Sequence, residues 1–234
     1  MFGKVMIGGL VALVVAVLGW MAYPHVETAR IWYRVTGVDV SHHQGRIDWP
    51  RVADSGVQFA YLKATEGGDF VDGRFRDNWQ AAKAAGLAVG GYHFFRQCKD
   101  GREQAANFLK TLPPVLDAED IGPCPPGSAR LDPVAEIGAF LDAVEAAAWC
   151  RPVLYVTPQF DNAWLDSEFA AETFWLRSIF LPPTFREDRW AFWQYHHDGR
   201  RAGIDGAVDL DAFRGSPEDL QSLIRTSGCF VRDG

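Results

Sequence analysis

The 234-residue sequence lacks the short motifs that mark several common kinds of site. No G-x-G-x-x-G motif and no P-loop follows any strand-like segment, which argues against a nucleotide site. No H-E-x-x-H, H-x-x-H or C-x-x-C spacing occurs, which argues against zinc, and no G-x-S-x-G elbow supports a Ser–His–Asp triad. Positive charge is also in deficit, since the net charge is −7. This argues against a nucleic-acid partner, because binding nucleic acid needs a basic surface. We therefore expect no metal, no cofactor and no nucleic-acid partner.

Cysteine is scarce too, with only Cys98, Cys124, Cys150 and Cys229. Four cysteines suit an exported domain, where disulfides persist, although unpaired buried thiols are the alternative. They allow three pairings, and their spacing does not choose among them. The chain length suits one sizeable domain with its own hydrophobic core.

One long uncharged segment lies at the N-terminus. "VMIGGLVALVVAVLGWMAY", Val5 to Tyr23, follows Lys4 and approaches the roughly 20 residues of a membrane-spanning helix. A cleaved signal peptide has a shorter apolar core of about 7–15 residues. We expect a signal anchor over residues 1–23, a linker over 24–34 and one domain over 35–234. The domain would then face the periplasm or the cell exterior, anchored to the membrane; the alternative is secretion after signal cleavage.

Strand-like and helix-like segments alternate along the rest of the chain. The strand-like segments are residues 33–40, 57–65, 87–95, 113–119, 152–157, 173–178, 190–195 and 207–213. The helix-like segments are residues 47–56, 74–86, 102–112 and 132–149, with little helix between the last three strands. Such alternation implies parallel strands with right-handed crossovers. It predicts a closed α/β barrel that is short of helices late in the chain, whereas an open doubly wound sheet is the alternative.

Polar residues recur where these predicted strands end. They are Asp39, Lys63, Glu66, Tyr92, His93, Asp117, Glu119, Gln194, Asp209 and Asp211. In a barrel the active site gathers at the C-terminal ends of the strands, so these side chains would face a single opening.

The segment "PPVLDAED" carries the sharpest candidate site. Asp117 and Glu119 are two residues apart on a strand, so both carboxyl groups project from the same face. Two like charges so close cannot both ionise cheaply, and the pKa of one should rise. A carboxyl that stays protonated can give its proton to a leaving group, as carboxyl pairs do when they cleave glycosidic bonds. A solvated strand end without a role is the alternative, and Asp120 breaks the alternation.

A metal site is the other interpretation of these groups. Asp39, His93, Asp117 and Glu119 could in principle hold a hard cation or zinc. His93 lies in a strongly aromatic strand, however, and a packed histidine is the simpler interpretation there.

Six segments, in this order, resemble glycoside hydrolase family 25, the Chalaropsis-type lysozymes. They are "GVDVSHHQGRIDW", "YLKATEG", "GGYHFF", "VLDAED", "PVLYVT" and "WQYHHDGRRAGIDGAVDLDAF". The resemblance implies an irregular TIM-like (β/α)5β3 barrel, here preceded by one transmembrane helix. It also implies hydrolysis of the β-1,4 bond between N-acetylmuramic acid and N-acetylglucosamine, with peptidoglycan as the partner. A non-catalytic glycan-binding or scaffolding protein and a glycosidase acting on chitin-like polymers are the alternatives.

By this resemblance Glu119 matches the general acid and Asp117 its acidic partner. Asp39 and Asp209 match the acidic residues of the first and last strands. A D-x-E pair leaves little room for an inverting water or for a carboxylate nucleophile. We therefore expect the 2-acetamido group of the substrate to attack its own anomeric carbon, oriented by Asp117, with net retention.

Further positions match the substrate-lining residues of the family. Tyr92, Gln194 and Trp193 do so, and we add Lys63 and Glu66, although core packing is the alternative for Trp193. The sequence departs from the family at Asp211, where asparagine is common, and at Arg177 and Ser178. We expect a monomer.

If that barrel is right, Cys98 and Cys124 follow neighbouring strands at one end of it. Cys150 precedes a strand and Cys229 lies in the tail, so both would sit at the other end. We predict the pairs Cys98–Cys124 and Cys150–Cys229, which non-reducing peptide mapping would check.

Overall fold

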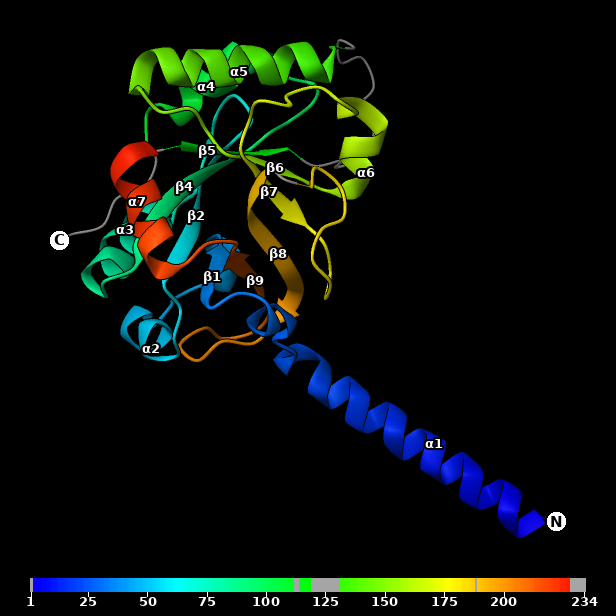
Figure 1. Ribbon diagram of the computed structural model, residues 1–234. Coiled ribbons are helices and arrows are strands. Elements are labelled where there is room, and N and C mark those ends of the chain that lie inside the picture. Colours follow the sequence, from blue (N-terminus) through cyan, green and yellow to red (C-terminus); the bar gives the residue numbers. More distant parts are fainter. Residues whose placement is uncertain (1, 112–113, 119–130, 188, 228–234) are drawn as a thin grey trace.

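Nine strands form one mixed, curled sheet, with seven α-helices, in the computed structural model (Figure 1), which describes residues 2–111, 114–118, 131–187 and 189–227. The strands are β1 (Val35–Val40), β2 (Phe59–Glu66), β3 (Phe70–Val71), β4 (Ala88–Phe94), β5 (Pro114–Ala118), β6 (Leu154–Val156), β7 (Phe174–Arg177), β8 (Trp190–Gly199) and β9 (Val208–Phe213). The helices are α1 (Phe2–Ala22), α2 (Trp49–Asp54), α3 (Phe75–Ala84), α4 (Gly101–Phe108), α5 (Pro133–Ala148), α6 (Pro158–Phe160) and α7 (Pro217–Ser227).

The strand order is β1-β9-β8-β7-β6-β5-β4-β2-β3, and β1 also pairs with β2. From β2 through β4, β5, β6 and β7 to β8 the neighbours are parallel. Strand β9 is antiparallel to both β8 and β1, and β3 is antiparallel to β2. The carboxyl ends of the parallel strands therefore meet at one edge of the sheet, together with the start of β9.

The fold class predicted from the sequence, an irregular (β/α)5β3 barrel with a transmembrane helix, is wrong. The sheet is a mixed, curled one of nine strands, because β3 adds to β2 as an antiparallel strand. The two-residue β3 is too short to leave a periodic pattern in the sequence, which is why the pattern did not reveal it.

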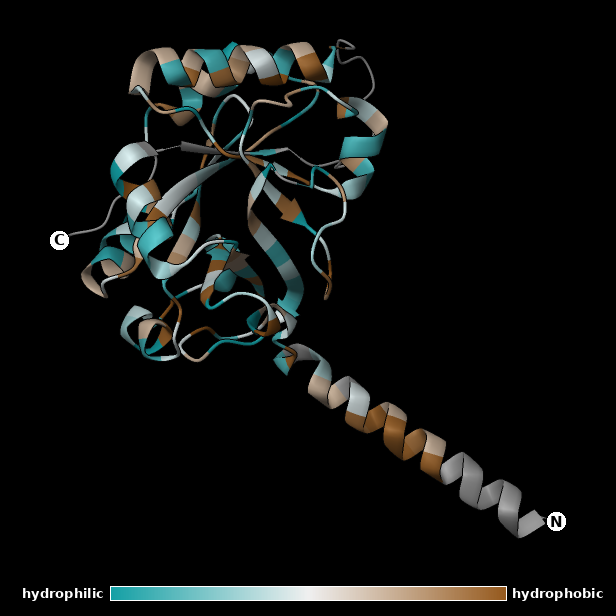
Figure 2. Cartoon of the chain, viewed as in Figure 1, coloured by the Kyte–Doolittle hydropathy of each residue, from teal (hydrophilic) through white to brown (hydrophobic). Residues whose placement is uncertain are grey.

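The prediction of a transmembrane helix is also wrong. Across the part of the chain that the structure describes, no helix is long and apolar enough to cross a membrane. Helix α1 projects away from the body (Figure 1), and its apolar stretch is visible in Figure 2.

The segment predicted as a linker, residues 24–34, packs on the body. His196 Nε2 lies 2.8 Å from the backbone oxygen of Tyr23, which directly precedes the segment. Arg201 Nη1 donates to Glu27 Oε1 at 3.0 Å, and the Trp32 ring lies 6.0 Å from the ring of Trp193. The division of the chain at residues 23 and 34 stays a prediction.

Aspartate caps fix where three of the helices begin. Asp48, Asp100 and Asp132 each accept a hydrogen bond from a backbone N–H in the first turn of α2, α4 and α5, respectively. These caps satisfy backbone donors that a helix start leaves unpaired. Proline near the start of α2 and α5 has a backbone angle already suited to the first helical turn.

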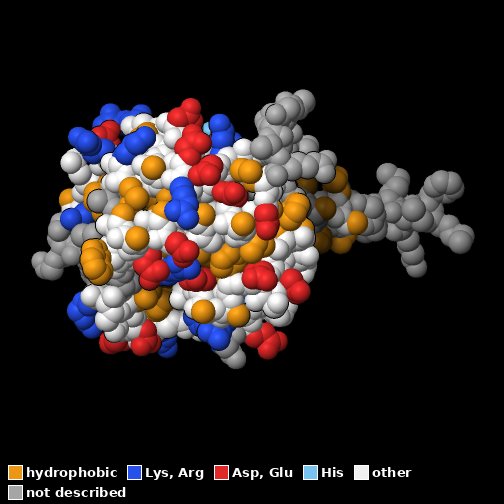
Figure 3. All heavy atoms as spheres, turned by 90° about the horizontal axis from the view of Figure 1, so that it is seen from above, with side chains coloured by type: hydrophobic (Ala, Val, Ile, Leu, Met, Phe, Trp, Pro, Cys, Tyr) orange, Lys and Arg blue, Asp and Glu red, His pale blue; other side chains and the backbone are white. Residues whose placement is uncertain are grey.

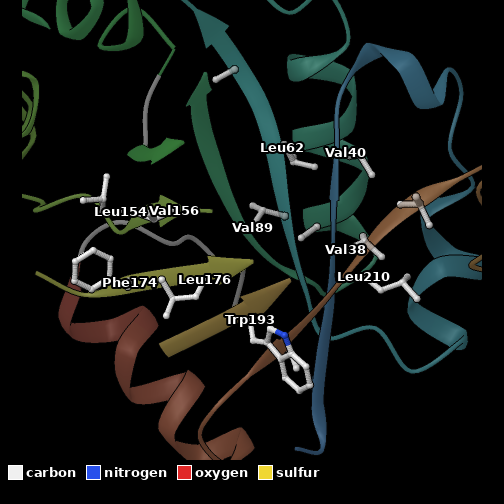
Figure 4. Packing of buried hydrophobic residues seen from close by; sticks show 14 of the residues in the cluster. Val38, Val40, Leu62, Val89, Leu154, Val156, Phe174, Leu176, Trp193 and Leu210 are labelled. Carbon is white, nitrogen blue, oxygen red and sulfur yellow. The ribbon is translucent and has the colours of Figure 1, made fainter. Parts of the chain in front are cut away.

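The two faces of the sheet bury different side chains. The outer face packs aliphatic residues, together with some aromatic ones, against the helices. Figure 4 labels Val38, Val40, Leu62, Val89, Leu154, Val156, Phe174, Leu176, Trp193 and Leu210 in this cluster. The inner face carries aromatic residues, among them Phe59, Tyr61, Trp175, Phe192 and Phe213. The rings of Tyr61 and Trp175 are stacked at 4.4 Å. These rings form an aromatic floor inside the curl of the sheet.

Acidic and basic side chains intermix on the face that carries α5 (Figure 3). One group ties the end of α5 to the segment before β7: Arg151 Nη1 donates to Asp142 and Glu145, and Nη2 donates to Glu172. Because Asp142 and Glu145 are more than half exposed, solvent screens those two pairs, and each contributes little to stability.

Gly37 provides the first test of this packing. A Cβ atom at Gly37 would overlap the ring of Phe59, which the aromatic floor holds in place. We expect Gly37→Ala to destabilise the protein by about 1–3 kcal/mol, since overpacking a closed core forces side chains off their rotamers. Gly138→Ala is the matched control, because in α5 the added methyl meets only Phe169 at 3.9 Å. Urea unfolding that gives Gly37→Ala the wild-type free energy would contradict this account.

Candidate active site

A cavity of about 380 Å³ opens at the edge where the parallel strands end. Its lining comes from β1, β2, β4, β5, β6, β7, β8 and β9 and from adjoining loops. The lining residues are Asp39, Val40, Ser41, His43, Gln44, Lys63, Glu66, Tyr92, Phe94, Arg96, Asp117, Tyr155, Trp175, Gln194 and Asp209. We call this space the carboxylate cavity. It brings together seven of the residues that the sequence nominated: Asp39, Lys63, Glu66, Tyr92, Asp117, Gln194 and Asp209.

Three aspartates from three strands share the carboxylate cavity. Asp39 on β1 lies directly opposite Asp209 on β9 in the antiparallel pairing, and Asp117 projects from β5. Asp39 is only 7% exposed and Asp117 only 9%. Burial raises the pKa of Tyr92 well above its usual value, and the charges of these three aspartates raise it further. Tyr92 therefore keeps its proton and is available as a hydroxyl donor.

A chain of hydrogen bonds holds Asp39. Gln194 Nε2 donates to Asp39 Oδ2 at 2.9 Å. The hydroxyl of Tyr155 donates to Gln194 Oε1 at 2.9 Å, which fixes the orientation of the amide. Since the amide can bridge in this way in only one orientation, Asp39 is held in one position.

An ion-paired cluster forms the wall at the end of β2. Lys63 Nζ donates to Glu66 Oε2 at 2.6 Å, and Arg96 Nε donates to Glu66 Oε1 at 2.8 Å. Lys63 Nζ also lies 4.7 Å from the centre of the Phe94 ring. Burial would raise the pKa of Glu66, but the hydrogen bonds from Lys63 and Arg96 outweigh it and lower that pKa. The wall thus holds two cations and one carboxylate that stays ionised.

Two of the residues nominated for catalysis or substrate binding are not in this arrangement. Glu119 lies outside the described residues, so the structure does not place it. Trp193 is fully buried on the outer face of the sheet, where its Nε1 donates to the backbone oxygen of Ser178 at 2.5 Å. It does not line the carboxylate cavity, because Gln194 faces inward and its neighbour on the strand must face outward.

The chain also resembles known proteins along most of its length. The sequence profile named Glycosyl hydrolases family 25 matches residues 38–204. The chain belongs to this family. It is a glycoside hydrolase, which confirms the resemblance seen in the sequence.

Three similar proteins illustrate the match. This family 25 hydrolase is 36% identical over 205 residues to the uncharacterized protein YegX of Escherichia coli O157:H7, covering 82% of this chain and 74% of that protein. It is 35% identical over 210 residues to Lysozyme M1 of Streptomyces globisporus, covering 81% and 71% of the two chains. The solved structure of a family 25 glycosyl hydrolase from Bacillus anthracis superposes with a TM-score of 0.74 at 31% identity, covering 81% of this chain and 93% of that one.

The family 25 hydrolase has cavity residues that the sequence reading did not nominate. Tyr155 and Trp175 come from β6 and β7, and Arg96 follows β4. Strand alternation could have found the first two. Tyr155 stands between Leu154 and Val156, and Trp175 stands between Phe174 and Leu176. The flanking residues of each face the outer side of the sheet, so the central residue faces inward. Nothing in the local pattern indicates Arg96, whose ion pair with Glu66 joins residues 30 apart.

His93 is a packed core residue of the hydrolase. It is fully buried; its Nδ1 lies 2.7 Å from Thr65 Oγ1 and its Nε2 lies 3.2 Å from Gln104 Oε1. The described residues contain no group of three or more His, Cys, Asp or Glu side chains that could hold a metal ion. Burial lowers the pKa of His93 to about 4.

The cysteine predictions are tested only in part. Cys98 and Cys150 are disulfide-bonded, and no cysteine among the described residues is free. Cys124 and Cys229 lie outside the described residues. The pairing stays a prediction.

His93 makes the hydrolase sensitive to mild acid. An unfolded histidine has a pKa near 6.5, whereas the folded pKa is about 4, so between these values the unfolded chain binds the extra proton. Stability should therefore fall as the pH drops from about 6.5 to 4, by roughly 3 kcal/mol. Urea unfolding at several pH values would measure this loss in wild type and in His93→Gln, which should show less of it.

His197→Gln is the control for this measurement, because His197 is exposed. It should keep the wild-type dependence on pH. If His93→Gln shows the same loss between pH 6.5 and 4 as His197→Gln, then His93 is not the group responsible.

Proposed function

We propose that this family 25 hydrolase cleaves the β-1,4 bond between N-acetylmuramic acid and N-acetylglucosamine of peptidoglycan in the carboxylate cavity. The single observation that carries the proposal is the meeting of Asp39, Asp117 and Asp209 in one cavity on a family 25 chain. The name of Lysozyme M1, a relative over most of both chains, supports the same substrate. Carboxyl groups that share a confined site are the machinery that glycoside hydrolysis uses.

Glu119 is our choice for the general acid, on the sequence argument alone. Asp117, buried at the cavity wall, would orient and polarise the 2-acetamido group of the cleaved sugar. The acetamido oxygen attacks the anomeric carbon, the glycosidic oxygen takes the proton of Glu119 and leaves, and water later opens the cyclic intermediate. Asp39 and Asp209 would stabilise the positive charge that develops on the sugar ring.

Substrate contacts follow from the rest of the lining. The Tyr92 hydroxyl can donate to sugar oxygens. Of the other polar residues that line the cavity, Lys63 can donate, Glu66 can accept and Gln194 can do either. Trp175 and Tyr155 add aromatic surface at the cavity.

Peptidoglycan lies outside the cytoplasm, and we propose that the hydrolase acts there, in the periplasm or at the cell exterior. Cys98 and Cys150 are each disulfide-bonded, which supports an oxidising compartment. We also propose a monomer, which light scattering would check.

Removing the acid tests the catalytic claim. We expect Glu119→Gln to clear a suspension of purified peptidoglycan about 10²- to 10⁴-fold more slowly than wild type, because the amide cannot give a proton to the leaving group. Asp117→Asn should also be slow, since a neutral amide polarises the acetamido group less than a carboxylate does.

Glu218→Gln is the matched control, because Glu218 is an exposed glutamate at the start of α7 and does not line the carboxylate cavity. It should match wild type. If Glu119→Gln clears the suspension as fast as Glu218→Gln, the catalytic claim fails and a glycan-binding role remains. Mass spectrometry of the products separates peptidoglycan cleavage from cleavage of chitin-like polymers.

The first-formed anomer tests substrate assistance. Participation of the acetamido group predicts net retention, so a proton NMR time course should show the β-anomer of the new reducing end first. A glycan whose cleaved sugar carries a free 2-amino group should resist cleavage. An initial α-anomer would mean inversion and would exclude this mechanism.

A further inference from the structure

We propose that Asp211 is a positioning residue that stays protonated and donates a hydrogen bond to Asp39, which keeps Asp39 ionised and aimed at the carboxylate cavity. The catalytic part of this inference rests on the proposed function. The placement of the proton does not, since it follows from the contacts of Asp211 itself.

Asp211 lies beneath the cavity, inside the curl of the sheet. It sits on β9 two residues after Asp209, so both side chains project from the same face. In the pairing it lies opposite Gly37 on β1 and Gln194 on β8. It is fully buried. Because Gly37 has no side chain, Asp211 can reach toward Asp39, two residues further along β1.

The hydrogen bonds of Asp211 leave one oxygen without a donor. Trp175 Nε1 donates to Oδ1 at 2.9 Å. Oδ2 is buried and receives no hydrogen bond from the residues that the structure describes. The carboxyl group of Asp39 lies within hydrogen-bonding reach of Asp211. Two ionised carboxylates are both acceptors, so only a proton between them can satisfy this contact.

The surroundings decide which carboxyl group keeps that proton. Asp39 accepts from Gln194 Nε2 and opens to the cavity, where water can reach it. Asp211 is sealed from solvent, and burial raises its pKa well above the usual value, with further contributions from Asp39 and Asp209. The protein therefore places the proton on Asp211 and the charge on Asp39.

The titratable groups near Asp211 come from four strands. Asp39 on β1, Asp209 on β9 and Tyr61 on β2 lie inside the curl, whereas Tyr195 on β8 lies on the outer face of the sheet. Burial raises the pKa of both tyrosines, and the charge of Asp211 would raise each further. These neighbours are acids and phenols, so none supplies a positive charge that could stabilise an ionised Asp211.

This arrangement gives Asp39 two donors, Gln194 and Asp211. A carboxylate held by two donors keeps its charge and its orientation while the sugar passes through a positively charged transition state. The acid form of Asp211 can be mimicked closely by asparagine, whose amide oxygen would accept from Trp175 while its NH₂ group donates to Asp39. Leucine fills a similar volume without either bond.

Two measurements test the placement of the proton without using activity. The first is NMR of protein labelled with ¹³C-aspartate, in which the Asp211 carboxyl resonance is assigned by its absence from the Asp211→Asn variant. This resonance should keep the chemical shift of a protonated carboxyl group through pH 7. A raised folded pKa also means that the folded state holds a proton that the unfolded chain loses above about pH 4. The unfolding constant of wild type should thus rise relative to that of Asp211→Asn, by up to about tenfold per pH unit, from pH 4 to 7.

Asp205→Asn, at an exposed aspartate, is the control and should show no such change against wild type. An Asp211 resonance at the ionised position by pH 6, or parallel unfolding constants for wild type and Asp211→Asn, would overturn the proposal.

Activity tests the positioning role. Asp211→Asn should keep kcat within about threefold of wild type, whereas Asp211→Leu should lose about 10- to 100-fold in kcat with little change in KM, because one donor to Asp39 is gone. Equal losses in both variants would overturn the role. If wild type itself leaves peptidoglycan intact, the proposed function fails, while the resonance and the unfolding constants still decide where the proton lies.

Discussion

The hydrogen bond from Gln194 Nε2 to Asp39 Oδ2 joins residues 155 apart in the sequence, and the cavity depends on it. It requires β8 and β1 to lie on the two sides of β9, which pairs antiparallel with both. The same register sets Asp39 opposite Asp209 and puts Asp211 beneath them. One contact thus couples the curvature of the sheet to the position of the carboxylate that faces the substrate.

Crowding acids at one place would ordinarily destabilise a fold. This chain limits that penalty by giving three of the acids distinct partners. Asp39 accepts from an amide, Asp211 accepts from the indole of Trp175, and Glu66 is held between Lys63 and Arg96. The aromatic floor below excludes water, so these electrostatic contacts are stronger than they would be in solvent. The larger hydrophobic cluster that holds the sheet lies on its other face, against the helices.

Strand alternation made much of the site predictable. Asp39 lies between Val38 and Val40, so one inward acid among outward aliphatics could be inferred without a structure. The same rule excludes Trp193 from the cavity, since it cannot face inward beside Gln194, and leaves core packing as its role. Contacts between distant segments were not predictable. The Glu66–Arg96 ion pair and the contact between Asp211 and Asp39 depend on the curvature of the sheet. The pairing of the two-residue β3 with β2 depends on it as well. Apolar length alone also misled the reading of the N-terminal segment as a transmembrane helix.

The most direct test of the central claim is a crystal structure of the Glu119→Gln variant with a bound tetrasaccharide of alternating N-acetylmuramic acid and N-acetylglucosamine. The account predicts the scissile bond inside the carboxylate cavity, with the 2-acetamido group of the cleaved sugar about 3 Å from an Asp117 carboxyl oxygen. Glycan bound elsewhere, or an acetamido group directed away from Asp117, would contradict it.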